Sequence, residues 1–134
     1  MKIFHKAKDG GPLSTVTGYW LIEAKRIFSI ALLKFENGSR DQYHSHAFGS
    51  ISWVLGKGRL TEEHLNGLAE FHKPGFKPIV TKRSTFHRVF SSGVTWVLTL
   101  RGPWAKEWSE YDFSTNTYTL LKDNRVVVAS YKGY

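Results

Sequence analysis

Short segments rich in β-branched and aromatic residues recur along this chain, and a turn containing glycine, proline or asparagine follows most of them. This pattern is typical of an antiparallel sandwich or barrel, because each short strand must turn back to pair with a neighbour. The segment 24–34 also has a composition that suits a helix, although we favour a strand there. We expect an all-β fold with strands at 17–22, 26–36, 42–55, 59–64, 77–82, 86–90, 94–101, 116–121 and 125–130.

The chain has the length of one domain. It contains 134 residues, and no linker rich in Pro, Gly or Ser divides it, so we expect a single domain over 1–134. Cysteine is absent, which excludes disulfides and thiolate metal sites, so that a metal would have to bind through His, Asp or Glu. We found neither an apolar run of the ~18 residues that a membrane helix needs nor a signal-peptide pattern. We therefore expect a cytoplasmic protein without membrane contact.

The chain is basic, because 19 Lys and Arg residues outnumber 11 Asp and Glu residues and give a formal charge of +8. Such a balance favours anionic partners, for example phosphorylated sugars, nucleotides or nucleic acid. The basic residues are scattered, which is typical of a solvated surface rather than of a nucleic-acid interface. A small anionic ligand is therefore the expected partner, and nucleic acid is the weaker alternative. The sequence has neither a glycine-rich phosphate loop nor a serine-hydrolase elbow.

Two histidines, His44 and His46, stand one residue apart in an expected strand. Side chains two apart on a strand point to the same face, so both imidazoles would converge if that face lines an interior. An imidazole pair suits Zn, Fe, Ni, Cu or Mn better than Ca or Mg. A third histidine, His87, lies in another expected strand and could complete a set of three ligands with open positions for water or substrate. The alternative is that all three are structural or surface histidines.

The spacing around the first two histidines resembles the signature of the cupin superfamily. The stretch 38–58 reproduces its glycine, five residues, H-x-H and closing glycine. The cupin motif also has a glutamate four or five positions after the second histidine, where this chain has Ser50 and Ile51. His87 falls where the second cupin motif has its histidine, although the preceding "RST" lacks the proline and glycine of that motif and Ser91 replaces its asparagine.

Two longer stretches, 44–63 and 86–111, are similar to a group of small single-domain bacterial and phage cupins that has no defined common activity. The resemblance covers about 19–121. It implies an antiparallel double-stranded β-helix, the cupin jelly-roll barrel. Small cupins often pair through edge strands, so a homodimer is one expected assembly.

The resemblance makes His44, His46 and His87 the metal ligands, and a divalent transition metal (Fe, Zn, Ni or Mn) the cofactor. Three neutral imidazoles leave the full +2 charge on a bound ion, which strengthens it as a Lewis acid and as a binder of anions. The resemblance leaves oxygenase, isomerase and lyase chemistry open. It also leaves open a non-catalytic cupin that binds or sequesters a small ligand such as a sugar or a nucleotide.

Glu62 is the candidate catalytic residue. It follows the turn at 56–58, and we expect the resulting hairpin to place its strand beside 42–55. Because neighbouring side chains alternate, only one of Glu62 and Glu63 can point inward. Glu62 then either supports the metal ligands or acts as a general base, and a solvated surface position is the alternative. His64 shares its face and is a weaker candidate.

Three residues are candidates for substrate binding. Arg83 shares the parity of His87 and would point into the barrel, where it would bind a substrate anion or pair with an internal acid. Arg101 ends the segment 94–101 and is expected at the barrel mouth, with an ordinary surface position as the alternative. Ser50 is expected on the inward face of its strand.

Overall fold

The computed structural model describes residues 1–9, 14–38, 42–46, 48–83, 85–112, 115–122 and 126–132. Among these residues the chain forms strands, and no helix long and apolar enough to cross a membrane is found. The predicted all-β class is therefore confirmed. The strands are β1 (Lys2–Lys8), β2 (Val16–Ala24), β3 (Phe28–Phe35), β4 (Gln42–His44), β5 (Ser50–Leu55), β6 (Arg59–His64), β7 (Ala69–His72), β8 (Ile79–Thr81), β9 (His87–Ser92), β10 (Thr95–Arg101), β11 (Glu107–Asp112), β12 (Thr117–Lys122) and β13 (Val126–Lys132).

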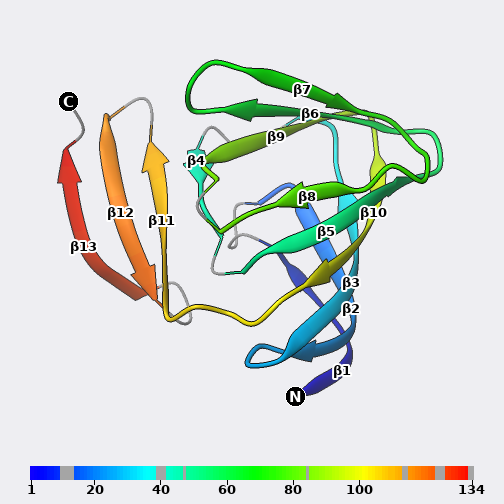
Figure 1. Cartoon of the computed structure of the whole chain (residues 1–134), viewed down its shortest axis with the longest axis horizontal. Coiled ribbons are helices and arrows are strands. Elements are labelled where there is room, and N and C mark those ends of the chain that lie inside the picture. The colour runs from blue at the N-terminus through cyan, green and yellow to red at the C-terminus, as the bar shows by residue number, and fades with distance from the viewer. Residues whose placement is uncertain are drawn as a thin grey trace.

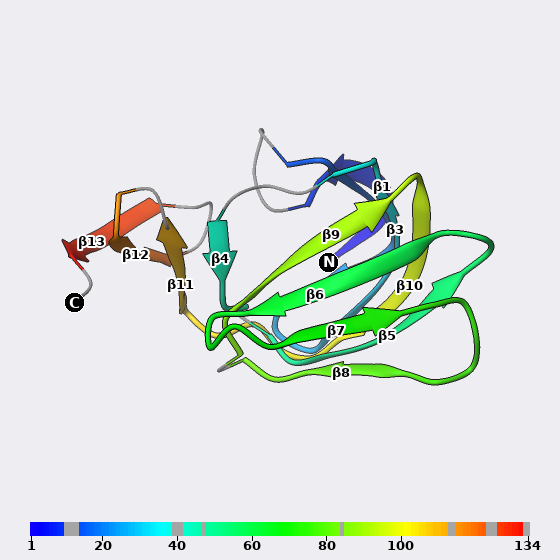
Figure 2. The ribbon, with the colours of Figure 1, turned by 90° about the horizontal axis from the view of Figure 1, so that it is seen from above.

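The strands are arranged in two sheets (Figure 1). One has the order β1-β2-β3-β10-β5-β8 and the other the order β13-β12-β11-β4-β9-β6-β7. Every strand pair in both sheets is antiparallel. Figure 2 shows that β11, β12 and β13 extend sideways from the rest, so the second sheet continues beyond the first.

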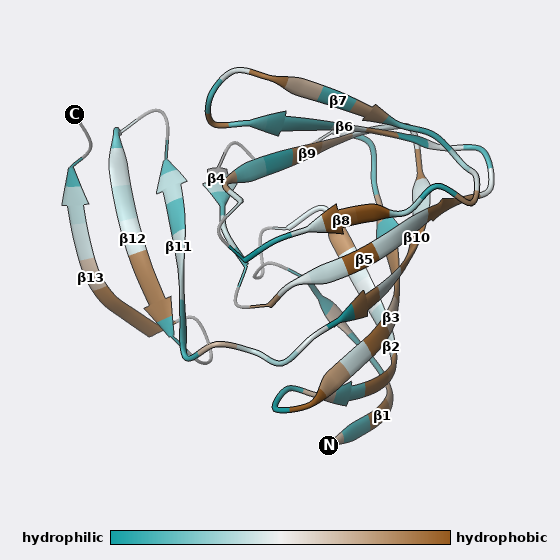
Figure 3. Cartoon of the chain, viewed as in Figure 1, coloured by the Kyte–Doolittle hydropathy of each residue, from teal (hydrophilic) through white to brown (hydrophobic). Residues whose placement is uncertain are grey.

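The hydrophobic core lies between the two sheets and is built mainly from the first. Its buried residues come from β2, β3, β5, β10 and, across the gap, β6: they are Trp20, Ala31, Leu33, Val54, Val97 and Leu60. Hydrophobic residues gather in β3, β5 and β10, whereas β6 and β11 are largely hydrophilic (Figure 3). One sheet thus supplies most of the apolar support, and the other presents polar side chains to the space between them.

Two sequence predictions about strands have opposite outcomes. The segment 24–34, which was compatible with a helix, forms a turn and then β3, so the preference for a strand is confirmed. The prediction of one strand over 42–55 is wrong. The chain leaves the second sheet after His44 and enters the first at Ser50, and at the break the backbone N–H of Ser45 donates to the carbonyl of Ser109 at 2.9 Å.

The two glycines at the ends of the stretch 38–58 have separate physical roles. Gly38 has φ +101°, a left-handed conformation that favours glycine, and its backbone N–H donates to the carbonyl of Ser91 at 2.9 Å. Gly58 lies against Thr95, and a Cβ at this position would meet the Thr95 side chain at 2.1 Å. Thr95 itself is fully buried. Both glycines therefore hold the segments that flank the histidines in place.

Candidate metal centre

Three histidine side chains converge on the cavity between the sheets. His44 ends β4, His46 lies two residues beyond it, and His87 begins β9. One ring nitrogen from each lies within 4.8 Å of the others, and the Nε2 atoms of His46 and His87 are 2.8 Å apart. The prediction that these three imidazoles come together is confirmed.

The strand register explains why they meet. His44 is paired directly with His87 on β9, and it is also paired with Glu110 on β11. His87 is in turn paired with His64 on β6. Side chains of directly paired residues lie on the same face of a sheet. Four neighbouring strands therefore carry one row of titratable side chains, in the order Glu110, His44, His87 and His64.

The donor set fits a divalent transition metal. Two nitrogen ligands at about 2.0–2.1 Å from one ion and at right angles to each other would be about 3 Å apart, which is close to the separation of the His46 and His87 nitrogens. The ring of His87 is also in the required tautomer. Its Nδ1 donates to Glu62 Oε2, so Nε2 carries the lone pair and faces the other histidines. His44, His46 and His87 are thus the residues that would hold the ion.

Glu62 is the buried carboxylate behind the triad. Its residue exposure is 5%, and besides His87 it accepts a hydrogen bond from His72 Nε2 at 3.2 Å. Burial alone would raise the pKa of its carboxyl, but the hydrogen bond and electrostatic interaction with His87, the hydrogen bond of His72 and the electrostatic interaction with His64 lower it to about 2. Both carboxylate oxygens therefore face histidines, and the geometry makes Glu62 a residue that positions His87.

Glu62 reaches the site by a different route from the expected one. The predicted hairpin between its strand and 42–55 is wrong, because β5 belongs to the first sheet and β6 to the second. Instead, β6 pairs with β9, and this pairing brings Glu62 next to His87. Glu63 points the other way and pairs with Arg88 at 2.8 Å, as the alternation predicted.

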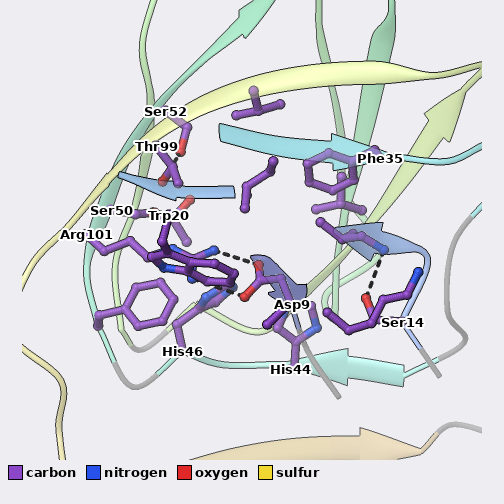
Figure 4. A pocket seen from close by; sticks show the side chains of 18 of the residues that line it. Asp9, Ser14, Trp20, Phe35, His44, His46, Ser50, Ser52, Thr99 and Arg101 are labelled. Carbon is purple, nitrogen blue, oxygen red and sulfur yellow. Dashed lines mark hydrogen bonds and ion pairs between the residues drawn. The ribbon is translucent and has the colours of Figure 1, made fainter. Parts of the chain in front are cut away.

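The histidines open onto a cavity of about 550 Å³ between the sheets. Ser50 lines it, as predicted, and so does Ser52, which donates to Thr99 at 2.9 Å. In Figure 4, His44 and His46 lie on one side of the pocket, and Asp9 and Arg101 lie beside them. The cavity has room for a small ligand in contact with the triad.

Arg101 is buried rather than placed at an open mouth. Its side chain is 3% exposed, and two of its nitrogens donate to the Asp9 carboxylate at 3.1 and 2.6 Å. The guanidinium also lies 4.5 Å from the centre of the Phe48 ring. The predicted mouth position is therefore wrong. Arg101 lines the cavity, but its charge is balanced by Asp9.

Arg83 does not point into the barrel. Its side chain is exposed, and it borders an outer hollow beside His46 and Trp108, not the cavity between the sheets. The parity argument failed because β9 begins only at His87, and before it the N–H of Thr85 donates to the carbonyl of Lys82.

Sequence reasoning missed several polar residues that line the cavity. Glu110 is 6% exposed and is paired with His44 across the sheet. It lies on β11, which was not predicted as a strand. The face to which Glu110 points could therefore not be derived from side-chain alternation. The missed strand β1 contributes further groups. The positively charged residues of the lining, apart from Arg101, are Lys2, Lys6, Lys8 and Lys25.

Replacing Glu62 by glutamine is expected to lower the affinity of the triad for zinc about 10- to 100-fold, the usual effect of losing the carboxylate partner of a ligand histidine. The amide oxygen of the new side chain can still accept from His87, but the amide lacks the charge that raises the basicity of the imidazole. Zinc affinity is measured by competition with a chelator. Glu63→Gln on the outer face of β6 is the matched control, and equal affinities of the two variants would contradict the positioning role.

No family model and no curated protein matches this chain. Solved structures do match. The chain is similar to a sugar phosphate isomerase of the cupin superfamily from Silicibacter pomeroyi, with a TM-score of 0.64 and 12% identity over 98% of this chain and 92% of that chain. It is also similar to a cupin-like protein from Thermotoga maritima, with a TM-score of 0.58 and 19% identity over 77% and 81%. Its TM-score to the iron(II) form of HppE is 0.58, with 12% identity over 72% of this chain and 55% of that chain. The chain therefore has the cupin jelly-roll fold.

Proposed function

We propose that this protein is a metal-dependent enzyme that acts on a small anionic substrate in the cavity between its sheets, and that isomerisation of a phosphorylated sugar is its reaction. The observation that carries the proposal is the convergence of His44, His46 and His87 on a cavity that Lys25 also lines, with its ammonium over Trp104. A triad of ligands leaves coordination positions open, as in catalytic rather than structural metal sites.

The three histidines would hold one divalent ion of iron, zinc, nickel or manganese. When bound, this ion would supply a Lewis acid that polarises a carbonyl or hydroxyl oxygen of the substrate. The chain supplies three neutral ligands, so it leaves the +2 charge available to the substrate. Glu62 holds the ring of His87 in the orientation that this role requires.

A lysine at the cavity would attract and orient the anionic end of the substrate. This residue is Lys25, which follows β2, whereas the ammonium groups of Lys6 and Lys8 on β1 lie against Tyr19 and Thr17 on the other face of the sheet. The Lys25 ammonium lies 4.6 Å from the centre of the Trp104 ring, which holds it near the cavity wall. A phosphate fits such a point charge well. Arg101 has a smaller role in this scheme, because Asp9 already balances its charge.

An aldose–ketose isomerisation also needs a group that moves a proton between neighbouring carbons. Glu62 is engaged with His87 and His72, so it is not placed for this step. Glu110 is the buried carboxylate on the other side of the triad, beside His44, and it lines the same cavity. We therefore assign the proton transfer to Glu110. The fold comparison supports the reaction class, because the similar cupin from Silicibacter pomeroyi is described as a sugar phosphate isomerase.

The test is deuterium exchange. Protein loaded with zinc, manganese or iron(II) is incubated in D₂O with pentose and hexose phosphates, and the exchange at the carbon next to the carbonyl is followed by proton NMR. Exchange is expected with loaded wild-type protein and is expected to be lost in Glu110→Gln. Glu107→Gln, an exposed glutamate on the same strand, is the control. Binding of a sugar phosphate without exchange would contradict the enzyme proposal and favour a ligand-binding protein.

A further inference from the structure

A second cluster of titratable side chains lies on the β6–β7 hairpin, behind the triad. Glu62 and His64 alternate along β6, and Glu70 and His72 alternate along β7. Glu62 and Glu70 are directly paired across the hairpin. All four side chains therefore share one face of the hairpin. Of the four, the sequence reasoning had considered Glu62 and His64 but not the two on β7.

Donor atoms of Glu62, His64 and Glu70 all lie within 4.8 Å of one another, and His72 approaches the two carboxylates from β7. His72 Nε2 is 3.2 Å from Glu62 Oε1 and 3.9 Å from Glu70 Oε2. His64 Nε2 is 3.7 Å from the same Glu62 oxygen and 3.8 Å from the same Glu70 oxygen. Each of the two histidines thus approaches both carboxylates with its Nε2 atom.

Three of these four separations exceed a hydrogen bond, but all are near the spacing of ligands around a metal ion. Four ligands at about 2.0–2.1 Å from a tetrahedral ion are about 3.3 Å apart. His64 adds an independent observation. Its Nε2 is buried and makes no hydrogen bond to any of the residues that the structure describes, although it faces the two carboxylates. Buried imidazole nitrogens usually have a hydrogen-bond partner, and a metal ion bound at this nitrogen would explain why His64 Nε2 lacks one.

The charge of the cluster also differs from that of the triad. The two carboxylates balance a divalent cation, whereas the three histidines of the triad leave its charge uncompensated. An imidazole among the ligands suits zinc and neighbouring transition metals better than calcium or magnesium. His72 donates to Glu62 Oε1 and would orient that carboxylate toward the ion.

We propose that the β6–β7 hairpin holds a second divalent transition metal through His64 Nε2, Glu62 Oε1 and Glu70 Oε2, with His72 positioning the Glu62 carboxylate. Glu62 links this ion to the triad, because its other oxygen accepts from Nδ1 of His87. The second ion fixes the Glu62 carboxylate, and Glu62 fixes the His87 ring. This site does not depend on the proposed isomerase activity, and it exists whether or not the triad binds a substrate.

The test counts bound zinc. Metal-free protein is titrated with zinc chloride by calorimetry, and the ions retained after gel filtration are counted by mass spectrometry. Wild-type protein is expected to bind two zinc ions per chain. Glu70→Gln and His64→Ala are each expected to bind one, with the triad ion retained. His44→Ala, which leaves the hairpin ligands in place, is expected to retain the hairpin ion.

Glu63→Gln is the control and is expected to retain two ions, because its carboxylate lies on the opposite face. Glu70 is 60% exposed, so its substitution is expected to leave the fold intact, and circular dichroism checks this. One zinc ion per chain in both wild type and Glu70→Gln would overturn the proposal, and so would two ions in both. Neither count depends on turnover, so a failure of the isomerase proposal leaves this test unchanged.

Discussion

Replacing His87 by alanine is expected to remove one metal ion per chain relative to the wild-type protein. His87 is the central member of the triad, since its Nε2 lies 2.8 Å from that of His46 and its strand pairs directly with His44. The loss of one of three ligands costs more affinity than the roughly 10- to 100-fold that follows from the loss of a supporting residue. Elemental analysis of protein purified without added metal, and again after zinc loading, measures the difference.

His5→Ala is the matched control for this substitution. His5 also lines the cavity, but its ring is stacked on Trp20 and its Nε2 lies 3.3 Å from a Glu23 carboxylate oxygen. It is therefore expected to leave the metal content unchanged. If His87→Ala keeps the wild-type metal content, or if His5→Ala loses as much metal, the assignment of the triad is wrong.

His44→Ala separates metal loss from loss of stability. Removing His87 also leaves the buried carboxylate of Glu62 without its main hydrogen-bond donor, at a cost of about 1–3 kcal/mol in the free energy of unfolding. His44 is paired with Glu110 and His87 across the sheet, so its removal leaves the bond between Glu62 and His87 in place. Both variants are thus expected to lose the same ion, but His87→Ala should unfold at a lower urea concentration. Equal midpoints would contradict the positioning role of Glu62.

The histidine triad could be predicted from the sequence because its logic is local. His44 and His46 are close in the chain, and their spacing together with the position of His87 resembled a known motif. The prediction held although its structural basis did not, because β4 ends at His44 and His46 lies beyond the strand. Convergence of the rings therefore depends on the pairing of β4 with β9. The spacing of residues within 42–55 gives no information about this pairing.

The surroundings of the triad could not be predicted, because they depend on pairings between distant strands. Parity counting assumes that a strand continues, and it failed for Arg83, where the chain turns before β9. The route of Glu62 to His87 depends on the β6–β9 pairing instead of the adjacent hairpin. Asp9 and Arg101 are separated by 92 residues, so the sequence around either residue does not indicate that they form an ion pair.

Replacing Asp9 by alanine is expected to destabilise the protein by about 2–3 kcal/mol, because it leaves the Arg101 guanidinium buried without its carboxylate. The Asp9 side chain is 25% exposed, so the expected loss of stability is at the lower end of the range for breaking a buried ion pair. The pair also joins the end of the edge strand β1 to β10, which lies further into the same sheet. Urea unfolding measures the change, and the melting temperature should fall by about 7–10 °C.

Glu36→Ala is the control, because Glu36 pairs with Lys34 at 3.3 Å in a half-exposed position where an ion pair contributes at most about 1 kcal/mol. Equal unfolding midpoints for Asp9→Ala and Glu36→Ala would show that Arg101 is not a desolvated charge. The double variant Asp9→Ala with Arg101→Met separates the two physical causes. If the cost comes from the unpaired buried charge, removal of that charge should restore most of the lost stability, whereas a cost from lost β1 packing should remain.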